Sequence, residues 1–198
     1  MYGGNTEHTH FTTLAHITPA NVSKLKVAWT YQTHDEFPGS EMQANPIVLD
    51  GVHATTPKLH VFALDAATGR ELWRFDPNNG VAPLSRIRHR GVVVTGDRVI
   101  FNYRNRLYAL DRATGKPILS FGTNGWVDLR AGLGRPIEGL SVSASPPGVV
   151  FEDLLIIGSS VPEALPRMRL PHQEAGKFGA DCDRKSRHGD GRRTEVRR

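Results

Sequence analysis

The sequence has only one cysteine among its 198 residues and contains no long hydrophobic run. A single cysteine, Cys182, excludes an intrachain disulfide and a cysteine-based zinc site. The longest apolar stretch, residues 154–157, has the length of a strand, whereas a membrane-spanning helix needs about 20 residues. Residues 1–5 offer neither a basic start nor an apolar core, so we expect no signal peptide in the sequence as written and no transmembrane segment.

Charge of one sign is in excess only near the C-terminal end. The formal net charge of +5 comes from 25 Lys and Arg against 20 Asp and Glu. Residues 1–163 hold 15 residues of each sign, whereas residues 164–198 hold 10 basic and 5 acidic residues without an alternating run of strand length. We therefore separate residues 1–163 from a basic tail, residues 164–198, which we predict to be disordered or frame-shifted.

What the sequence does contain is an internal repeat with a period of 46 residues. Residues 61–75 read VFALDAATGRELWRF and residues 107–121 read LYALDRATGKPILSF, with seven identical positions and no gap. In each copy an alternating stretch predicts a strand, Asp-x-x-Thr-Gly predicts a tight turn, and the residues after the turn predict the returning strand. A period of about 45 residues is typical of a four-stranded β-propeller blade. The sequence therefore predicts an all-β protein with about two to three such blades.

Partial copies of the unit flank the two full ones. Residues 25–31 resemble its end, with Trp29 placed 44 residues before Trp73. Residues 148–158 resemble its beginning. Between the N-terminus and the first partial copy, residues 18–24 predict one short helical turn, because a proline follows Thr18.

The repeated hairpin and its flanking segments resemble a known enzyme family. Residues 63–73, ALDAATGRELW, resemble the tryptophan-docking motif of quinoprotein dehydrogenases, which use pyrroloquinoline quinone (PQQ). Segments that follow the order of the membrane-type glucose and alcohol dehydrogenase branch are residues 2–5, 17–31, 43–51, 89–92 and 121–129. The resemblance covers about residues 2–163 and implies an eight-bladed propeller. It implies that residues 1–163 are the N-terminal part of that propeller, and we expect the resemblance to stop near residue 165.

The same resemblance implies that alanine, glycine and tryptophan of each motif join neighbouring blades. A flat tryptophan ring can stack on the peptide of the next blade's glycine, where no Cβ obstructs it. Leu119 stands at the tryptophan position of the second copy and predicts a weaker contact there. The predicted docking residues are Ala63, Gly69, Trp73, Ala109 and Gly115.

The resemblance implies PQQ and Ca²⁺ as cofactors and assigns residues to them. Arg90 matches an arginine that hydrogen-bonds the quinone, and its planar fork suits adjacent oxygens; an ordinary surface arginine is the alternative. Gln43 matches a polar PQQ contact, with an ordinary strand residue as the alternative. Ser145 matches a hydroxyl that binds a PQQ carboxylate, and Ser143 is its rival because the register is open here. Glu163 matches a calcium-ligating glutamate of the methanol dehydrogenase branch, with a solvated loop residue as the alternative.

The implied function is that of an oxidoreductase. A PQQ-dependent sugar or alcohol dehydrogenase in the periplasm would pass electrons to a quinone or cytochrome. The general-base Asp is expected beyond this chain, so no catalytic residue is assigned, and the isolated chain is expected to have little or no activity. We expect Asp65 and Asp111 to act in turns. We predict that the histidines are surface residues, namely His8, His10, His34, His53, His60 and His89.

Two other classes of function stay open at this point. One is a noncatalytic PQQ-repeat propeller that acts as a protein-interaction scaffold. The other is a protein that binds nucleic acid or anionic lipid through its basic tail, although we expect no specific nucleic-acid binding.

Overall fold

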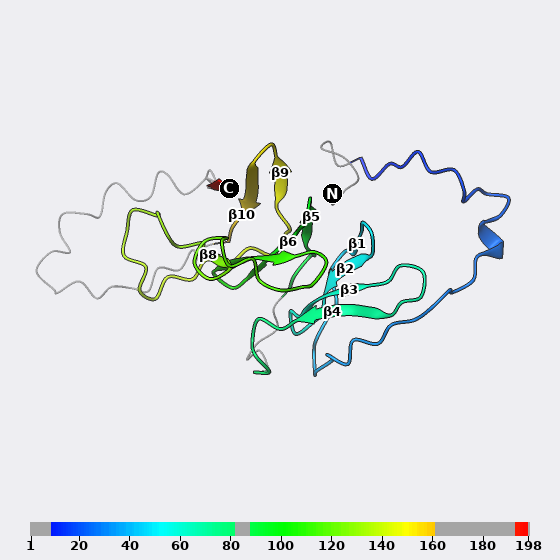
Figure 1. The fold of residues 1–198 in the computed structure, drawn as a ribbon, viewed down its shortest axis with the longest axis horizontal. Helices are drawn as coiled ribbons and strands as arrows, with labels where there is room; N and C mark the ends of the chain where they lie inside the picture. The colour runs from blue at the N-terminus through cyan, green and yellow to red at the C-terminus, as the bar shows by residue number, and fades with distance from the viewer. Residues whose placement is uncertain (1–8, 82–87, 161–192, 198) are drawn as a thin grey trace, which may run out of the picture.

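The computed structural model describes residues 9–81, 88–160 and 193–197 (Figure 1). Apart from one short 3-10 helix, η1 (Val22–Lys24), its regular elements are antiparallel strands, which confirms the predicted all-β class. The helix lies within the predicted helical turn. Residues 9–28 run outside the sheets, and several of their apolar side chains are exposed, including Phe11 and Val27.

The first sheet has four strands in the order of the sequence. They are β1 (Ile47–Val48), β2 (Val52–Thr55), β3 (Val61–Leu64) and β4 (Glu71–Phe75). The predicted hairpin forms between β3 and β4. Its turn is closed by Asp65 Oδ1, which accepts hydrogen bonds from the Thr68 amide at 2.8 Å and the Thr68 hydroxyl at 2.7 Å. These hydrogen bonds from Thr68 lower the pKa of Asp65.

The second sheet repeats the four-stranded pattern. Its strands are β5 (Val93–Thr95), β6 (Arg98–Tyr103), β7 (Arg106–Asp111) and β8 (Trp126–Asp128). Asp111 and Thr114 repeat the turn, with a hydrogen bond of 2.8 Å from the Thr114 amide to Asp111 Oδ1. The two sheets thus confirm that each full repeat belongs to one four-stranded blade.

The predicted returning strand of the second repeat, at residues 117–121, is wrong. Pro117 forms only an isolated bridge with Leu110, and the strand that pairs with β7 comes later, as β8. Pro117 stands where the first repeat has Glu71, the first residue of β4. Because proline has no N–H to donate to a ladder, the chain turns here and pairs further on.

The third sheet contains β9 (Val149–Phe151), β10 (Leu154–Gly158) and β11 (Arg193–Arg197), in the order β11-β10-β9. The partial copy at residues 148–158 therefore forms the start of a third blade. Strand β11 lies in the stretch for which the sequence predicts disorder. The rest of that stretch, residues 164–192 and 198, lies outside the described residues.

Most of the core lies between the sheets, and the central strands β3 and β7 are buried on both faces. One cluster joins the first and second sheets through Val61, Trp73 and Phe101 among others, and another joins the second and third through Ala109 and Leu155 among others. Alternate residues of β3 and β7 enter different clusters, as the two-residue period of a strand requires. Sheets that are stacked face to face in chain order form a partial β-propeller (Figure 1).

The indole rings of two tryptophans dock on the following sheet in the same way. Trp73 Nε1 donates a hydrogen bond to the Arg112 carbonyl at 2.9 Å, and its ring lies where a Cβ on Gly115 would stand. Trp29 Nε1 donates to the Ala66 carbonyl at 3.1 Å, and its ring lies in the same way over Gly69. Each contact joins one repeat to the next.

The other docking positions fit this arrangement. Ala63 lies opposite Trp73 in the β3–β4 ladder, and both Ala63 and Ala109 are fully buried. Leu119, at the tryptophan position of the second copy, is 70% exposed.

Candidate functional site

Three segments of the chain lie side by side, and each directly precedes the first strand of one sheet. We call them the inner segments. The Asn45 amide donates to the Arg90 carbonyl at 3.0 Å, and the Arg90 amide donates to the Ser145 carbonyl at 2.9 Å. We call this row of three residues the inner ladder. It brings the segments of the predicted cofactor residues Gln43, Arg90 and Ser145 together, although they span 103 positions of the sequence.

The inner ladder needs a glycine directly after Arg90. Gly91 has a φ of +134° and forms a parallel bridge with Asn45. A Cβ on Gly91 would lie 2.8 Å from the Asn45 carbonyl oxygen, which is closer than real Cβ contacts. The match of Gly91 to the family segment therefore has a physical reason in close backbone approach.

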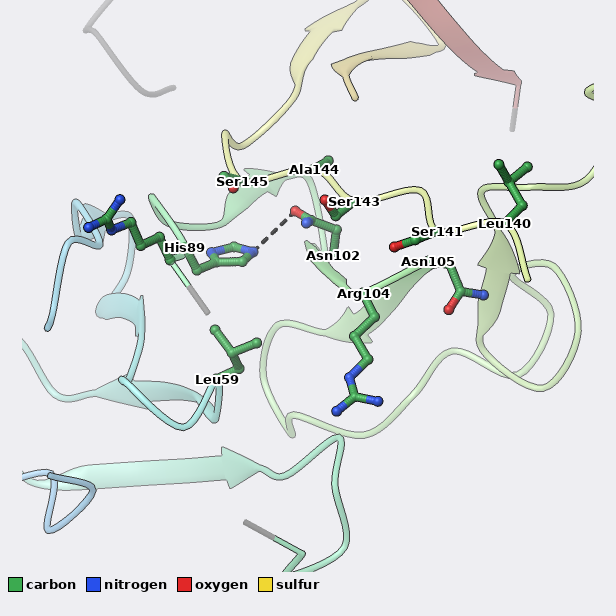
Figure 2. Close-up of a pocket in the computed structure, with 11 residues that line it drawn as sticks. Leu59, His89, Asn102, Arg104, Asn105, Leu140, Ser141, Ser143, Ala144 and Ser145 are labelled. Atoms are coloured by element: carbon green, nitrogen blue, oxygen red, sulfur yellow. Dashed lines mark hydrogen bonds between the residues drawn. The ribbon is translucent and has the colours of Figure 1, made fainter. Parts of the chain in front are cut away.

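A cavity of about 600 Å³ lies beside the ladder (Figure 2). Its wall carries guanidinium, amide and hydroxyl groups from the inner segments and from the β6–β7 hairpin, and none of its described lining residues is an Asp or Glu. Such a donor set suits an anionic ligand. The polar lining residues are Arg88, His89, Asn102, Arg104, Asn105, Ser141, Ser143 and Ser145.

The structure separates the predicted cofactor residues into two groups. Ser143 and Ser145 both line the cavity, whereas Arg90 and Gln43 are not among its lining residues. The Arg90 side chain is exposed. Gln43 is half-buried, and its side-chain amide donates to the Glu41 carboxylate.

His89 is buried in the wall of this cavity, so the prediction of a surface histidine is wrong here. Its Nδ1 accepts a hydrogen bond from the Gly91 amide at 3.2 Å, and its Nε2 lies 3.1 Å from Asn102 Oδ1 (Figure 2). Because Nδ1 is an acceptor, the proton is on Nε2, which donates to Asn102. Burial lowers the pKa of His89 to about 4.

His53 is a second buried histidine that the sequence analysis placed at the surface. Its Nε2 lies 3.2 Å from the Leu49 carbonyl, and its ring lies 6.0 Å from that of Trp73, centroid to centroid. Burial lowers the pKa of His53. No local pattern indicates either burial, since His53 contacts Trp73 of β4 and His89 contacts Asn102 of β6.

We expect these two histidines to make the fold sensitive to mild acid. The folded pKa of His89 is about 4 and the unfolded value is about 6.5, so the unfolded chain binds more protons between these limits. His89 alone therefore removes roughly 2 kcal/mol of stability between pH 7 and pH 5. Urea unfolding at the two pH values measures the loss, and His89→Asn should reduce it. An equal loss in the variant would contradict the assignment.

Sequence reasoning missed Asn102, Arg104 and Asn105, which come from the β6–β7 hairpin. A signal for Asn102 exists, because an amide interrupts the apolar stretch of β6 and is buried there. Arg104 is exposed at the tip of the hairpin with a φ of +54°, and the sequence does not predict this left-handed conformation for an arginine.

Glu163, the predicted calcium ligand, lies outside the described residues. Within residues 9–81, 88–160 and 193–197, no group of three or more His, Cys, Asp or Glu could hold a metal ion. In the same part of the chain, no helix has the length and apolar character to cross a membrane.

The stacked four-stranded sheets, joined by tryptophans that dock on the next unit's glycine, define a β-propeller protein. Residues 1–176 match the family described as PQQ glucose/ethanol/alcohol dehydrogenase, β-propeller domain. The chain therefore belongs to this family of PQQ-dependent dehydrogenases, as the resemblance of its hairpin predicted.

Individual relatives agree with this family. A quinoprotein ethanol dehydrogenase of Pseudomonas putida is 39% identical over 124 residues, which are 60% of this chain and 19% of the relative. The large subunit of a glycerol dehydrogenase of Gluconobacter thailandicus is 31% identical over 203 aligned residues, covering 89% of this chain and 27% of the relative. The crystal structure of the quinohemoprotein alcohol dehydrogenase of Comamonas testosteroni superposes with a TM-score of 0.64 at 27% identity, over 80% of this chain and 22% of that one. The chain thus spans about a fifth of the length of the first of these relatives.

Proposed function

We propose that this chain supplies part of the cofactor site of a PQQ-dependent dehydrogenase that oxidises an alcohol or a sugar. The observation that carries the proposal is the inner ladder, in which the Arg90 backbone is held between Asn45 and Ser145. An arginine fixed on both sides by backbone hydrogen bonds can present its side chain in a defined direction.

The residues present fit PQQ, a tricarboxylated ortho-quinone that, when bound, accepts the reducing equivalents of the alcohol. The exposed Arg90 side chain offers a planar fork of donors for the quinone oxygens. Ser145 and Ser143 offer hydroxyl donors from the wall of the cavity. Gln43 can add an amide donor once its hydrogen bond to the Glu41 carboxylate is broken. The described lining residues include no carboxylate, so none of them would repel the negatively charged cofactor.

The remaining parts of the reaction are proposed on family grounds. Ca²⁺ would take oxygen ligands that include Glu163. The general-base Asp would come from outside these 198 residues, so we expect little turnover from them alone. Electrons would pass to a cytochrome or a quinone, the acceptors named for two relatives, a 1-butanol dehydrogenase (cytochrome c) and a quinate/shikimate dehydrogenase (quinone). On the family resemblance, we expect this reaction in the periplasm.

We expect Arg90→Ala to weaken PQQ binding by about tenfold to a hundredfold, because it removes charge-assisted hydrogen bonds. The measurement is a titration of the 198-residue chain with PQQ and Ca²⁺, followed by quenching of tryptophan fluorescence. Arg70→Ala, an exposed arginine on the turn between β3 and β4, is the matched control and should bind PQQ as the original chain does. Equal affinity of the Arg90→Ala variant and the control would sink the proposed contact.

A further inference from the structure

The Arg90 amide, the Arg90 carbonyl and the Gly91 amide are all hydrogen-bonded. The Arg90 amide donates to Ser145 and the Arg90 carbonyl accepts from Asn45, so two of the three bonds join main chain to main chain. The third bond is different, because the Gly91 amide donates to a side chain, His89 Nδ1, at 3.2 Å. The direction of the Arg90 side chain therefore depends on a side chain next to it in sequence.

The imidazole can do this only in one protonation state. It accepts at Nδ1 and donates at Nε2 to Asn102 Oδ1, which is a neutral ring with the proton on Nε2. Protonation of Nδ1 would place one donor against another, the Gly91 amide, and would break this bond. His89 and Asn102 are both buried, at 5% exposure each, so water does not readily replace the lost acceptor.

We propose that neutral His89 is the positioning residue of Arg90, because its Nδ1 holds the Gly91 amide and thereby fixes the direction of the Arg90 side chain. The inference rests on the proposed contact of Arg90 with PQQ. It adds a titratable group to that contact, although His89 itself would touch neither the cofactor nor the substrate.

Burial favours the neutral form of His89, because it penalises the charged ring. The charged residues that line the same cavity, Arg88 and Arg104, are both cations. Glu41 lies 3.8 Å from Arg88, as measured between Glu41 Oε2 and Arg88 Nε, and does not line the cavity. No described lining residue is a carboxylate, so the imidazolium would have no ion-pair partner in the cavity wall. Burial lowers the pKa of His89 by more than the hydrogen bonds with Asn102 raise it.

Two substitutions of His89 separate its two hydrogen bonds. Asn at this position can accept at the place of Nδ1, because asparagine side chains readily bond the amide two residues on. Gln reaches the place of Nε2 and can keep the Asn102 partner, but it leaves the Gly91 amide without its acceptor. We expect His89→Asn to bind PQQ within about threefold of the original chain and His89→Gln to bind about tenfold more weakly.

A readout without PQQ tests the backbone directly. Amide hydrogen exchange at Gly91, followed by NMR on the full 198-residue chain, should be slow in the original chain and in His89→Asn, and about tenfold faster in His89→Gln. Circular dichroism in the near ultraviolet shows whether each variant keeps the tertiary packing. Unchanged Gly91 exchange in a folded His89→Gln variant overturns the inference.

A third variant tests the protonation state at constant volume. Asn102→Asp places a carboxylate beside His89 Nε2, and an opposite charge raises the pKa of a histidine. We expect loss of Gly91 protection and of PQQ affinity to begin at a higher pH in Asn102→Asp than in the original chain. An unchanged pH profile counts against the inference. If Arg90→Ala leaves PQQ binding intact while His89→Gln still frees the Gly91 amide, the cofactor contact fails and the positioning of the backbone stands.

Discussion

Replacing Trp73 by Ala is expected to destabilise the fold by about 4 kcal/mol, the size typical of a buried tryptophan. The ring is only 8% exposed, and it belongs to the core cluster between the first two sheets. The substitution would also leave the Arg112 carbonyl without the indole hydrogen bond of 2.9 Å. Urea unfolding at pH 7, followed by circular dichroism, measures the change in the free energy of unfolding.

The repeat itself provides the control for this experiment. Leu119 holds the same position in the second copy, yet its side chain is 70% exposed. Leu119→Ala should therefore change the free energy of unfolding by less than about 0.5 kcal/mol. If both substitutions cost the same, the contact between Trp73 and the second sheet does not stabilise the fold as the geometry indicates.

The sequence predicted the sheets well where local chemistry decides the structure. The Asp-x-x-Thr-Gly turn forms in both copies, because Asp65 and Asp111 accept hydrogen bonds from the amides and hydroxyls of their own turns. It failed for the fourth strand of the second sheet. There Pro117 interrupts the ladder, and the position of β8 depends on pairing with β7 rather than on the repeat.

The site was less predictable than the fold, because its groups come from distant parts of the chain. The family resemblance pointed to Arg90 and Ser145, which the inner ladder places next to each other. The burial of His89 depends on Asn102, which lies 13 positions away on β6, and no local pattern indicates that pair. The polar wall formed by the β6–β7 hairpin likewise depends on how the sheets stack.

The docking contacts and the inner ladder are two ends of one arrangement. Trp73 joins the first sheet to the second through Gly115, and Trp29 docks over Gly69 of the first sheet, while the ladder joins the segments that precede the three sheets. Because packed interiors transmit strain, we expect a substitution at Gly69 or Gly115 to shift the positions of Asn45, Arg90 and Ser145 relative to one another. The stability of the outer contacts therefore bears on the proposed cofactor site.

Gly115→Ala is expected to cost about 3 kcal/mol. The residue has a φ of +70°, where an alanine is strained, and its Cβ would overlap the ring of Trp73. Gly96→Ala is the matched control, because Gly96 also has a positive φ, +54°, but has no atom within 4 Å of the added Cβ. It should cost only about 1 kcal/mol, the backbone part of the effect. Urea unfolding of both variants gives the difference between their free energies of unfolding. Equal losses would show that the Trp73 ring is not in contact with Gly115.

The double variant then assigns the steric part to its partner. With Trp73 already replaced by Ala, the added Cβ at residue 115 meets no ring, so only the backbone strain of about 1 kcal/mol should remain. The sum of the losses of unfolding free energy in the two single variants should therefore exceed the loss in the double variant by about 2 kcal/mol. Strict additivity would mean that the clash lies elsewhere and that the indole does not dock on this glycine. A coupling of the expected size would identify the contact between Trp73 and Gly115 as the joint between the first two blades.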